Sequence, residues 1–334
     1  MKRSTIVSIA KQLNISTATV SRALNNKGNV KESTRERVLE AAREFNYIPN
    51  QLARSLQNAK TNTIAVVIPD ITEDFFGNIT AQIDHVVSRD KFMLLVCDTH
   101  ENATLEKKYL DMLHERRVDA IVLATVDLTG NTSRRIRESG IPIVYIDNIP
   151  SCEEIKSITI DNQLASHIAV DYLFEKGHRK IAGIFGSQEE TTGCERYRGY
   201  IGALSEHDLS KDLNLIEFGD YKYASGYRCM KNLLSNEKMT AVYVTSEKMT
   251  YGAIKAIQEA ELCIPEDISV IGFDVHKGEN PVVLPITSIR QPEMEIGTEV
   301  GDLLLKIMGG YTIDDSGRIM LTPFIEEGRT VRSM

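Results

Sequence analysis

The apolar positions between residues 5 and 25 repeat at the spacing of two short helices joined by a tight turn. In the first helix they occur at i, i+3, i+4 and i+7, which is one face of a helix. These positions are Ile6, Ile9, Ala10 and Leu13. Asn14 and Ile15 are predicted to form the turn. Ser16 is predicted to cap the second helix, because its hydroxyl can accept a hydrogen bond from a backbone N–H.

The second helix carries two opposite faces. Val20 and Leu24 lie four residues apart and are predicted to point inward. The other stripe is polar and short-stemmed, with one guanidinium, and consists of Thr17, Ala18, Ser21, Arg22 and Asn25. Such a stripe can approach a DNA groove closely and leave Arg22 free to reach a guanine edge. An ordinary helical hairpin with a solvated face would give the same pattern, so the neighbouring elements must decide.

A third helix is expected from Ser33 to about Phe45, because its apolar residues again share one face. Ser33 and Glu36 are predicted to form a capping box at its start. The helix should end before Pro49, and a short segment, residues 51–58, follows it. Eight residues are too few for a stable isolated helix.

Beyond residue 59 the pattern changes to continuous apolar runs that alternate with helical periodicity. The runs predicted as strands are 64–68, 92–98, 120–124, 142–147, 157–160, 180–186, 241–245 and 268–274. The segments predicted as helices are 105–116, 132–139, 164–176, 194–206, 225–234 and 250–260. This alternation is typical of parallel sheets covered by helices on both faces. There are too many strands for one small sheet, so we expect two α/β lobes.

Charge is distributed unevenly along the 334 residues. The first 60 residues hold 11 Lys and Arg against 4 Asp and Glu, whereas the remaining 274 hold 28 against 43. A basic end on an acidic protein is typical of a small module that binds the phosphate backbone of DNA.

Several classes of protein are disfavoured by composition and motifs. No apolar run approaches the roughly 20 residues of a membrane span, and the N-terminus lacks the apolar core of a signal peptide, so we expect a cytoplasmic protein. The five cysteines are scattered without a CxxC pair, which predicts neither a zinc site nor a disulfide framework. No HExxH, GxSxG or GxxxxGK[ST] motif occurs. We therefore expect no enzyme, cofactor or metal.

The segment ATVSRALN, followed by NVKESTRERVLEAAREFNYIPNQLARSL, closely resembles the headpiece and hinge of the LacI/GalR family of bacterial transcription regulators over about the first sixty residues. The resemblance implies an all-α helix-turn-helix headpiece (1–49), a hinge helix and linker (50–60) and a periplasmic-binding-protein-like α/β core (61–334) of two doubly wound parallel-sheet lobes. By the same resemblance lobe one comprises 61–159 and 290–319, and lobe two comprises 160–288 and 320–334.

In that family the headpiece binds operator DNA, and this assigns roles to residues of the chain. We expect Thr17, Ala18 and Arg22 to read bases in the major groove. The residues expected mainly to hold phosphates are Ser16, Thr19, Ser21 and Asn25. The resemblance implies that the hinge, capped at Asn50, becomes helical only on DNA and beside its twin from a second subunit. Leu56 would then wedge between base pairs of the minor groove, with Ala53 beside it.

An effector is expected at the carboxyl ends of the strands, where ligands lie in open parallel sheets. The resemblance implies that Arg196 and Asp274 contact it. Residues of second rank are Phe75, Thr125, Asp147, Asp161 and Tyr221. Phe75 could equally belong to the core, and Arg196 and Asp274 could be structural. Ser246 replaces an amide or acid that the family usually has in an NDxxAxG segment, so the effector could be smaller, more acidic or phosphorylated than usual.

Together these features predict a sequence-specific DNA-binding regulator, a repressor, that acts as a homodimer on a pseudo-palindromic operator and responds to a sugar or sugar derivative. A transcriptional activator of the same architecture remains an alternative, and so does a carbohydrate-binding receptor without DNA regulation. Salt-dependent DNA binding would separate the regulators from the receptor.

Overall fold

The computed structural model describes residues 5–25, 28, 30–45, 47, 61–150, 155–236, 239–276, 285–311 and 317–334. It divides into two compact units, Met1–Thr61 and Asn62–Met334, each of which is described by itself. The expected hinge segment 51–58, with Ala53 and Leu56, and Asn50 before it lie outside the described residues.

The first unit is a bundle of three helices, α1 (Ile6–Leu13), α2 (Thr17–Leu24) and α3 (Glu32–Glu44). Its small core includes Ile9, Val20 and Val38, one from each helix, and all three are fully buried. Asn14 takes the left-handed conformation, with φ 53°, and ends α1. Because asparagine tolerates this conformation better than most residues, the turn expected at this position forms.

Two of the expected caps can be compared with the structure. Ser16 caps α2 as predicted, since the backbone N–H of Thr19 donates to its Oγ over 3.0 Å. The capping box of Ser33 and Glu36 is wrong. Helix α3 begins at Glu32, and Lys31 precedes it without a side-chain cap. Ser33 therefore lies inside the first turn instead of before it.

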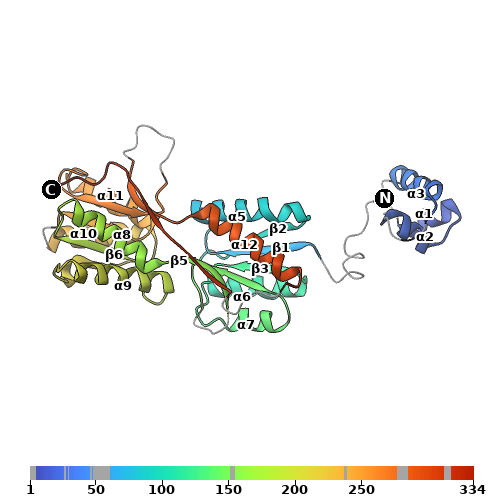
Figure 1. Cartoon of the computed structure of the whole chain (residues 1–334), viewed down its shortest axis with the longest axis horizontal. Helices are drawn as coiled ribbons and strands as arrows, with labels where there is room; N and C mark the ends of the chain where they lie inside the picture. Colours follow the sequence, from blue (N-terminus) through green and yellow to red (C-terminus); the bar gives the residue numbers. More distant parts are fainter. Residues whose placement is uncertain are drawn as a thin grey trace. The chain divides into compact units, whose positions relative to one another are not determined.

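The second unit contains two six-stranded sheets, each with helices on both faces (Figure 1). The first sheet has the order β11-β5-β4-β3-β1-β2, and all its pairs are parallel. Its strands are β1 (Thr63–Ile68), β2 (Met93–Asp98), β3 (Ala120–Leu123), β4 (Ile143–Ile146), β5 (Lys156–Ile160) and β11 (Arg318–Leu321).

The faces of this sheet follow the alternation of side chains along β1. Ile64 and Val66 pack in the cluster that includes helices α5 (Asp74–Val87) and α12 (Glu293–Met308). Ala65 and Val67 pack on the other face, in the cluster with α6 (Ala103–Glu115) and α7 (Asn131–Glu138). Both faces are apolar, which explains the continuous apolar run of the sequence.

The second sheet has the order β12-β10-β9-β8-β6-β7, and only the β12–β10 pair is antiparallel. Its strands are β6 (Ile181–Phe185), β7 (Ile216–Phe218), β8 (Ala241–Val244), β9 (Ser269–Phe273), β10 (Thr287–Arg290) and β12 (Phe324–Glu326). Its helices are α8 (Asn162–Glu175), α9 (Thr191–Glu206), α10 (Tyr223–Asn236) and α11 (Glu247–Glu259). The helical headpiece and the two α/β lobes confirm the predicted fold class.

The chain passes between the lobes at three places. These places follow β5, β10 and β11, because each of these strands is succeeded by an element of the other lobe. The boundaries expected near residues 159, 289 and 319 fall inside β5, β10 and β11, so those crossings lie one or two residues later. In the described part of the chain, no helix has the length and apolar character needed to cross a membrane.

Candidate functional site

The expected DNA-reading stripe lies on the open face of α2. Ser16, Thr17, Ala18 and Arg22 are exposed, and Thr19, Ser21 and Asn25 are half-buried. Within the described residues, no hydrogen bond or ion pair holds the guanidinium of Arg22. The structure thus leaves this side chain accessible, while Val20 and Ala23 on the same helix are buried in the headpiece core.

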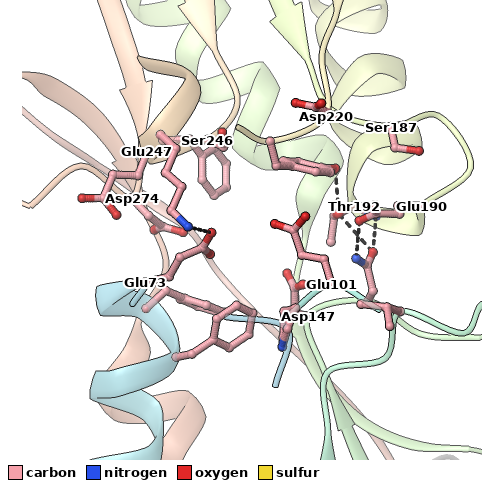
Figure 2. A pocket seen from close by; sticks show the side chains of 18 of the residues that line it. Glu73, Glu101, Asp147, Ser187, Glu190, Thr192, Asp220, Ser246, Glu247 and Asp274 are labelled. Atoms are coloured by element: carbon pink, nitrogen blue, oxygen red, sulfur yellow. Dashed lines mark hydrogen bonds and ion pairs between the residues drawn. The ribbon is translucent and has the colours of Figure 1, made fainter. Parts of the chain in front are cut away.

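A cavity of about 310 Å³ lies in the second unit, lined by residues of both lobes (Figure 2). Most lining residues come from segments that follow the carboxyl ends of strands, where the topology favours ligand binding. Seven of the eight expected effector residues line this cavity, namely Phe75, Thr125, Asp147, Arg196, Tyr221, Ser246 and Asp274.

Asp161 is the exception, since it does not belong to the cavity lining. Its Oδ1 accepts a hydrogen bond of 2.8 Å from the backbone N–H of Leu164 and so caps α8. Its carboxylate is used in starting a helix, because an N-cap side chain satisfies a backbone N–H that has no partner inside the helix.

Arg196 projects from α9 and is only 5% exposed. Its Nε donates to Oδ1 of Asn162 over 2.8 Å, and its Nη1 donates to the carbonyl of Thr245 over 2.9 Å. The guanidinium carbon lies 3.6 Å from the centre of the Phe273 ring, in a cation–π contact. These contacts fix the guanidinium at the cavity wall. Within the described residues, Nη2 makes no hydrogen bond and can serve a ligand.

Asp147 and Asp274 follow strands β4 and β9 directly and have left-handed backbones, with φ of 58° and 53°. Gln291 holds Asp274 through two hydrogen bonds, from its backbone N–H (3.0 Å) and from Nε2 (2.7 Å). No side chain of the described residues hydrogen-bonds the carboxylate of Asp147. Burial raises the pKa of both carboxyl groups, although Arg196 opposes the rise in each.

Two expected effector residues are largely engaged by the protein. The hydroxyl of Thr125 donates to Oε1 of buried Glu106 over 2.8 Å, and burial raises the pKa of that glutamate. Ser246 caps α11 by accepting from the N–H of Met249 over 3.3 Å. Both line the cavity, but each has a structural partner, so sequence position alone overstated their freedom to bind a ligand.

Phe75 and Tyr221 show how apolar packing shapes the cavity. Phe75 is 7% exposed, packs against Phe76 with an edge-to-face geometry and also belongs to the core. The hydroxyl of Tyr221 lies 3.2 Å from Oγ1 of Thr192. A Cβ on Gly186 would come within 1.9 Å of the Tyr221 ring, so only glycine permits this ring position.

Seven charged residues that the sequence reasoning did not name as site residues also line the cavity, and they are Glu73, Glu101, Glu190, Asp220, Lys222, Glu247 and Lys248. The segments after the strand ends could have indicated them, since Glu73 precedes α5 and Lys248 lies in the unusual SEKMTYG segment. The resemblance to the LacI/GalR family did not point to these residues.

Two lysines of lobe two make ion pairs with lobe one. Nζ of Lys248 lies 2.5 Å from Asp70 and 3.2 Å from Glu73. Nζ of Lys222 lies 2.9 Å from Glu101. Figure 2 shows the carboxylates of Glu73 and Glu101 on opposite sides of the cavity. The ion pairs therefore join the lobes at two separate points of the cleft.

A third connection consists of hydrogen bonds and centres on Asn148. Its Nδ2 donates to Oε2 of Glu190 over 2.6 Å, and its Oδ1 accepts from the N–H and the hydroxyl of Thr192. Burial, together with the Asp147 carboxylate, raises the pKa of Glu190 to about 7. Burial raises the pKa of Glu73 to about 7 as well, against the opposing charge of Lys248.

Comparison with protein families gives two matches. Residues 5–50 match the model described as "Bacterial regulatory proteins, lacI family", and residues 170–331 match the one described as "Periplasmic binding protein-like domain". The first match covers the three-helix unit, and the second lies within the two-lobed unit.

Similar proteins align along nearly their whole length. Catabolite control protein A of Priestia megaterium is 35% identical over 314 residues, which are 93% of this chain and 95% of that protein. The HTH-type transcriptional repressor CytR of Escherichia coli is 33% identical over 327 residues, 98% of this chain and 96% of that protein. A solved structure, the transcriptional regulator CelR in complex with cellobiose, has a TM-score of 0.75 and 28% identity, with coverage of 98% and 100%.

Proposed function

This chain belongs to the lacI family of bacterial regulatory proteins, and we propose that it represses transcription as a homodimer on a pseudo-palindromic operator. The observation that carries the proposal is the exposed polar stripe of α2 on a basic three-helix headpiece. A two-fold dimer presents two such stripes to two half-sites, which accounts for the symmetry of the operator.

The residues of α2 divide between two tasks. Thr17, Ala18 and Arg22 read base edges in the major groove, since their side chains are exposed and Arg22 can bond a guanine with two donors. The residues that hold phosphates are Ser16, Thr19, Ser21 and Asn25. Phosphate contacts fix the register of the helix without reading sequence.

The hinge supplies a second DNA contact in this proposal. Asn50 caps a short helix that forms on the DNA, Ala53 lies beside the base pairs and Leu56 wedges between them. Short helices are marginal in water, so order in this segment depends on DNA and on the partner subunit. The hinge can therefore respond to a change in the core.

A small effector, a sugar or a sugar derivative, binds in the cavity between the lobes. Its contacts come from both lobes, through Asp147 on one side and Arg196 and Asp274 on the other. A ligand that favours one angle between the lobes changes the spacing of the two hinges in the dimer. Couplings of this kind are typically about 1–3 kcal/mol and are reciprocal between DNA and ligand.

The two alternatives, a transcriptional activator of the same architecture and a carbohydrate-binding receptor without DNA regulation, are less favoured. The relatives are named as regulators, and we propose no catalytic activity for this chain. An activator would share every residue role above, because the sign of regulation depends on where the operator lies. A DNA-binding regulator of a bacterium acts on the chromosome, so the proposal places the chain in the cytoplasm.

Binding to selected duplexes tests the proposal. An operator would be recovered from random duplexes with the full chain, and its affinity measured by fluorescence anisotropy from about 50 to about 200 mM salt, where phosphate contacts make affinity fall steeply. Changing Leu56 to Ala should weaken operator binding and leave binding at the cleft unchanged. Recovery of no preferred sequence, or equal operator affinity for the two proteins, would contradict the proposal.

A further inference from the structure

The cavity between the lobes is strongly acidic. Its lining includes three cationic side chains, Arg196, Lys222 and Lys248. It also includes seven carboxylates, which are Glu73, Glu101, Asp147, Glu190, Asp220, Glu247 and Asp274. Figure 2 shows several of these carboxyl groups on facing walls of one cavity. A neutral sugar does not require such an excess of negative charge.

The three cations are already engaged by protein groups. Lys248 pairs with Asp70 and Glu73, and Lys222 pairs with Glu101. Arg196 is held by an amide, a backbone carbonyl and an aromatic ring instead of a carboxylate. None of the cations therefore forms an ion pair with Asp147, Glu190 or Asp274.

Asp147 is the focus of this excess of negative charge, which Arg196 offsets only in part. Burial raises the pKa of Glu73 and of Glu190, and the charge of Asp147 adds to the rise in both. Burial likewise raises the pKa of Asp147, and the charge of Asp274 adds to that rise. Asp274 has Gln291 and Glu190 has Asn148 as hydrogen-bond donors. Among the described residues, no side chain donates to Asp147. A cation beside Asp147 would interact favourably with all of these carboxylates.

We propose that the effector is an amino sugar, whose unacylated, protonated amino group lies beside Asp147 while its hydroxyls bond Arg196 and Asp274. This inference rests on the proposed function and names the chemical class of the ligand in the same cavity. A cavity of about 310 Å³ is at the low end of ligand sites, which fits one or two sugar rings.

Other charged ligands fit the cavity less well. A metal ion needs several donors around one point, and no group of three His, Cys, Asp or Glu side chains in the described part of the chain could hold one. A phosphorylated or acidic sugar, which the replacement at Ser246 suggested, would lie among seven lining carboxyl groups against three cations and be repelled. The charge of the cleft thus favours the amine.

The test compares matched sugars that differ in charge. For the full chain we would titrate glucosamine, galactosamine, mannosamine and the β-1,4-linked glucosamine dimer in a calorimeter. Each is compared with its neutral counterpart (cellobiose for the dimer), its N-acetylated form and, for the single rings, its 6-phosphate. We expect at least one amine to bind about tenfold or more tightly than its neutral and acetylated counterparts, as hydrogen bonds between charged groups do.

A substitution separates charge from shape. Asparagine adopts the left-handed conformation readily, so Asp147→Asn keeps the backbone at φ 58° and removes only the charge. It should weaken binding of the amine about tenfold and that of the neutral counterpart less. Asp208→Asn is the matched control, because Asp208 is exposed, has φ 53° and lies outside the cavity.

Proton release gives an independent reading. An ammonium group lowers the pKa values of nearby carboxyls, so binding of the amine at about pH 6, where its own amino group is already protonated, should release protons. Titration in buffers of different ionisation enthalpy measures this release. An anionic ligand would instead take protons up.

The inference is overturned if no amine binds, if a neutral, acetylated or phosphorylated sugar binds as tightly as its amine, or if Asp147→Asn weakens all sugars equally. Operator binding is measured separately by anisotropy. If the chain selects an operator and binds a neutral sugar, the proposed function stands and only the proposal of an amino sugar is refuted. A chain that selects no operator would refute the function itself.

Discussion

Around the cleft, single residues adopt backbone conformations that side chains usually avoid. Four residues of its lining, Glu101, Asp147, Tyr221 and Asp274, have φ between 53° and 65°. Such conformations cost of order 1 kcal/mol each and persist where the surrounding structure determines them. In this cleft they direct a carboxylate or phenol from the end of a strand into the cavity, so the strain serves the placement of ligand-binding groups.

The raised pKa of Glu190 makes the stability of the core depend on pH. The pKa is about 7 in the folded chain and has the ordinary value, 4.5, in an unfolded chain. At a pH between these two pKa values the folded state binds more protons than the unfolded state. The free energy of unfolding therefore falls as pH rises, and the stabilisation is lost by about pH 7.

Glu190→Gln removes this dependence. The free energy of unfolding of the variant minus that of the wild type should increase by about 1–2 kcal/mol from about pH 5 to about pH 8. This figure allows for partial exposure of the group. Urea unfolding at both pH values measures it. Glu138→Gln, at an exposed position of α7, is the control, and an equal pH response in both variants would contradict the assignment.

Arg22 should determine which bases are preferred. Arg22→Ala is expected to cost about 1–3 kcal/mol on the operator and to relax the preference at one base pair. Arg37→Ala removes the same charge from an exposed position on α3 and should weaken all duplexes uniformly. Competition between the operator and single-base variants measures both effects. Unchanged preference in Arg22→Ala would show that this residue binds only phosphate.

The sequence indicated which residues line the site better than it indicated which residues they pair with. Arg196 and Asp274 were predicted because the resemblance matched ERYRGY and GFD, and both line the cavity. Lys248 was not predicted, since its partners Asp70 and Glu73 lie in the other lobe and more than 170 positions earlier. Long-range pairs of this kind leave no local pattern.

At the scale of elements, α5 and α12 pack closely because glycines on α12 face α5. Figure 1 shows the two helices side by side on the first sheet. A Cβ on Gly301 would come within 2.7 Å of the Val86 side chain, and one on Gly297 within 2.7 Å of Gln82. The close approach of the helices thus depends on the absence of side chains at these positions.

Two glycine substitutions in this helix pair should have opposite effects. Gly301→Ala should destabilise the core by about 1–3 kcal/mol, because an added carbon forces packed side chains to shift. Gly77→Ala on α5 should stabilise it by about 0.5–1 kcal/mol, since a Cβ there meets nothing within 4 Å and alanine favours a helix. Thermal and urea unfolding measure both. The same sign for the two variants would contradict this account of the packing.

Most of the elements could be predicted from sequence, and the missed ones are helices α5 and α12 and strands β7, β10, β11 and β12. Strands β7 and β12 have three residues each, too few for a periodic signal. Helix α5 was passed over although Phe75, Ile79 and Ile83 repeat at helical spacing, because adjacent apolar residues blur the pattern. The boundary of α3 shifted by one residue, which was enough to remove its expected capping box.

At the scale of the whole two-lobed unit, the ion pairs of Lys248 and Lys222 stabilise the approach of the lobes without any ligand. The Lys248 pair is partly buried, with side chains 24–29% exposed, so salt screens it less than a surface pair. An effector that displaced Lys248 from Glu73 would replace the Lys248–Glu73 ion pair by its own contact with one of these two residues. The lobes can therefore adjust their angle at a modest energetic cost.

Lys248→Gln should loosen the cleft. We expect faster hydrogen exchange in the segments 69–76 and 246–252, because the free energy of opening falls by about 1 kcal/mol. Lys255→Gln is the matched control, since Lys255 pairs with Glu259 on the same helix and does not reach the other lobe. Exchange that is unchanged in Lys248→Gln, or equally fast in both variants, would contradict the role of this ion pair.

The three crossings between the lobes have a consequence for how the chain is made. The outermost strand of the first sheet, β11, comes from residues 318–321, although its neighbour β5 ends at residue 160. On the ribosome, that edge of β5 therefore stays unpaired until residues 318–321 have been made. An open strand edge can pair with another chain, so the nascent first lobe is exposed to aggregation until β11 is added.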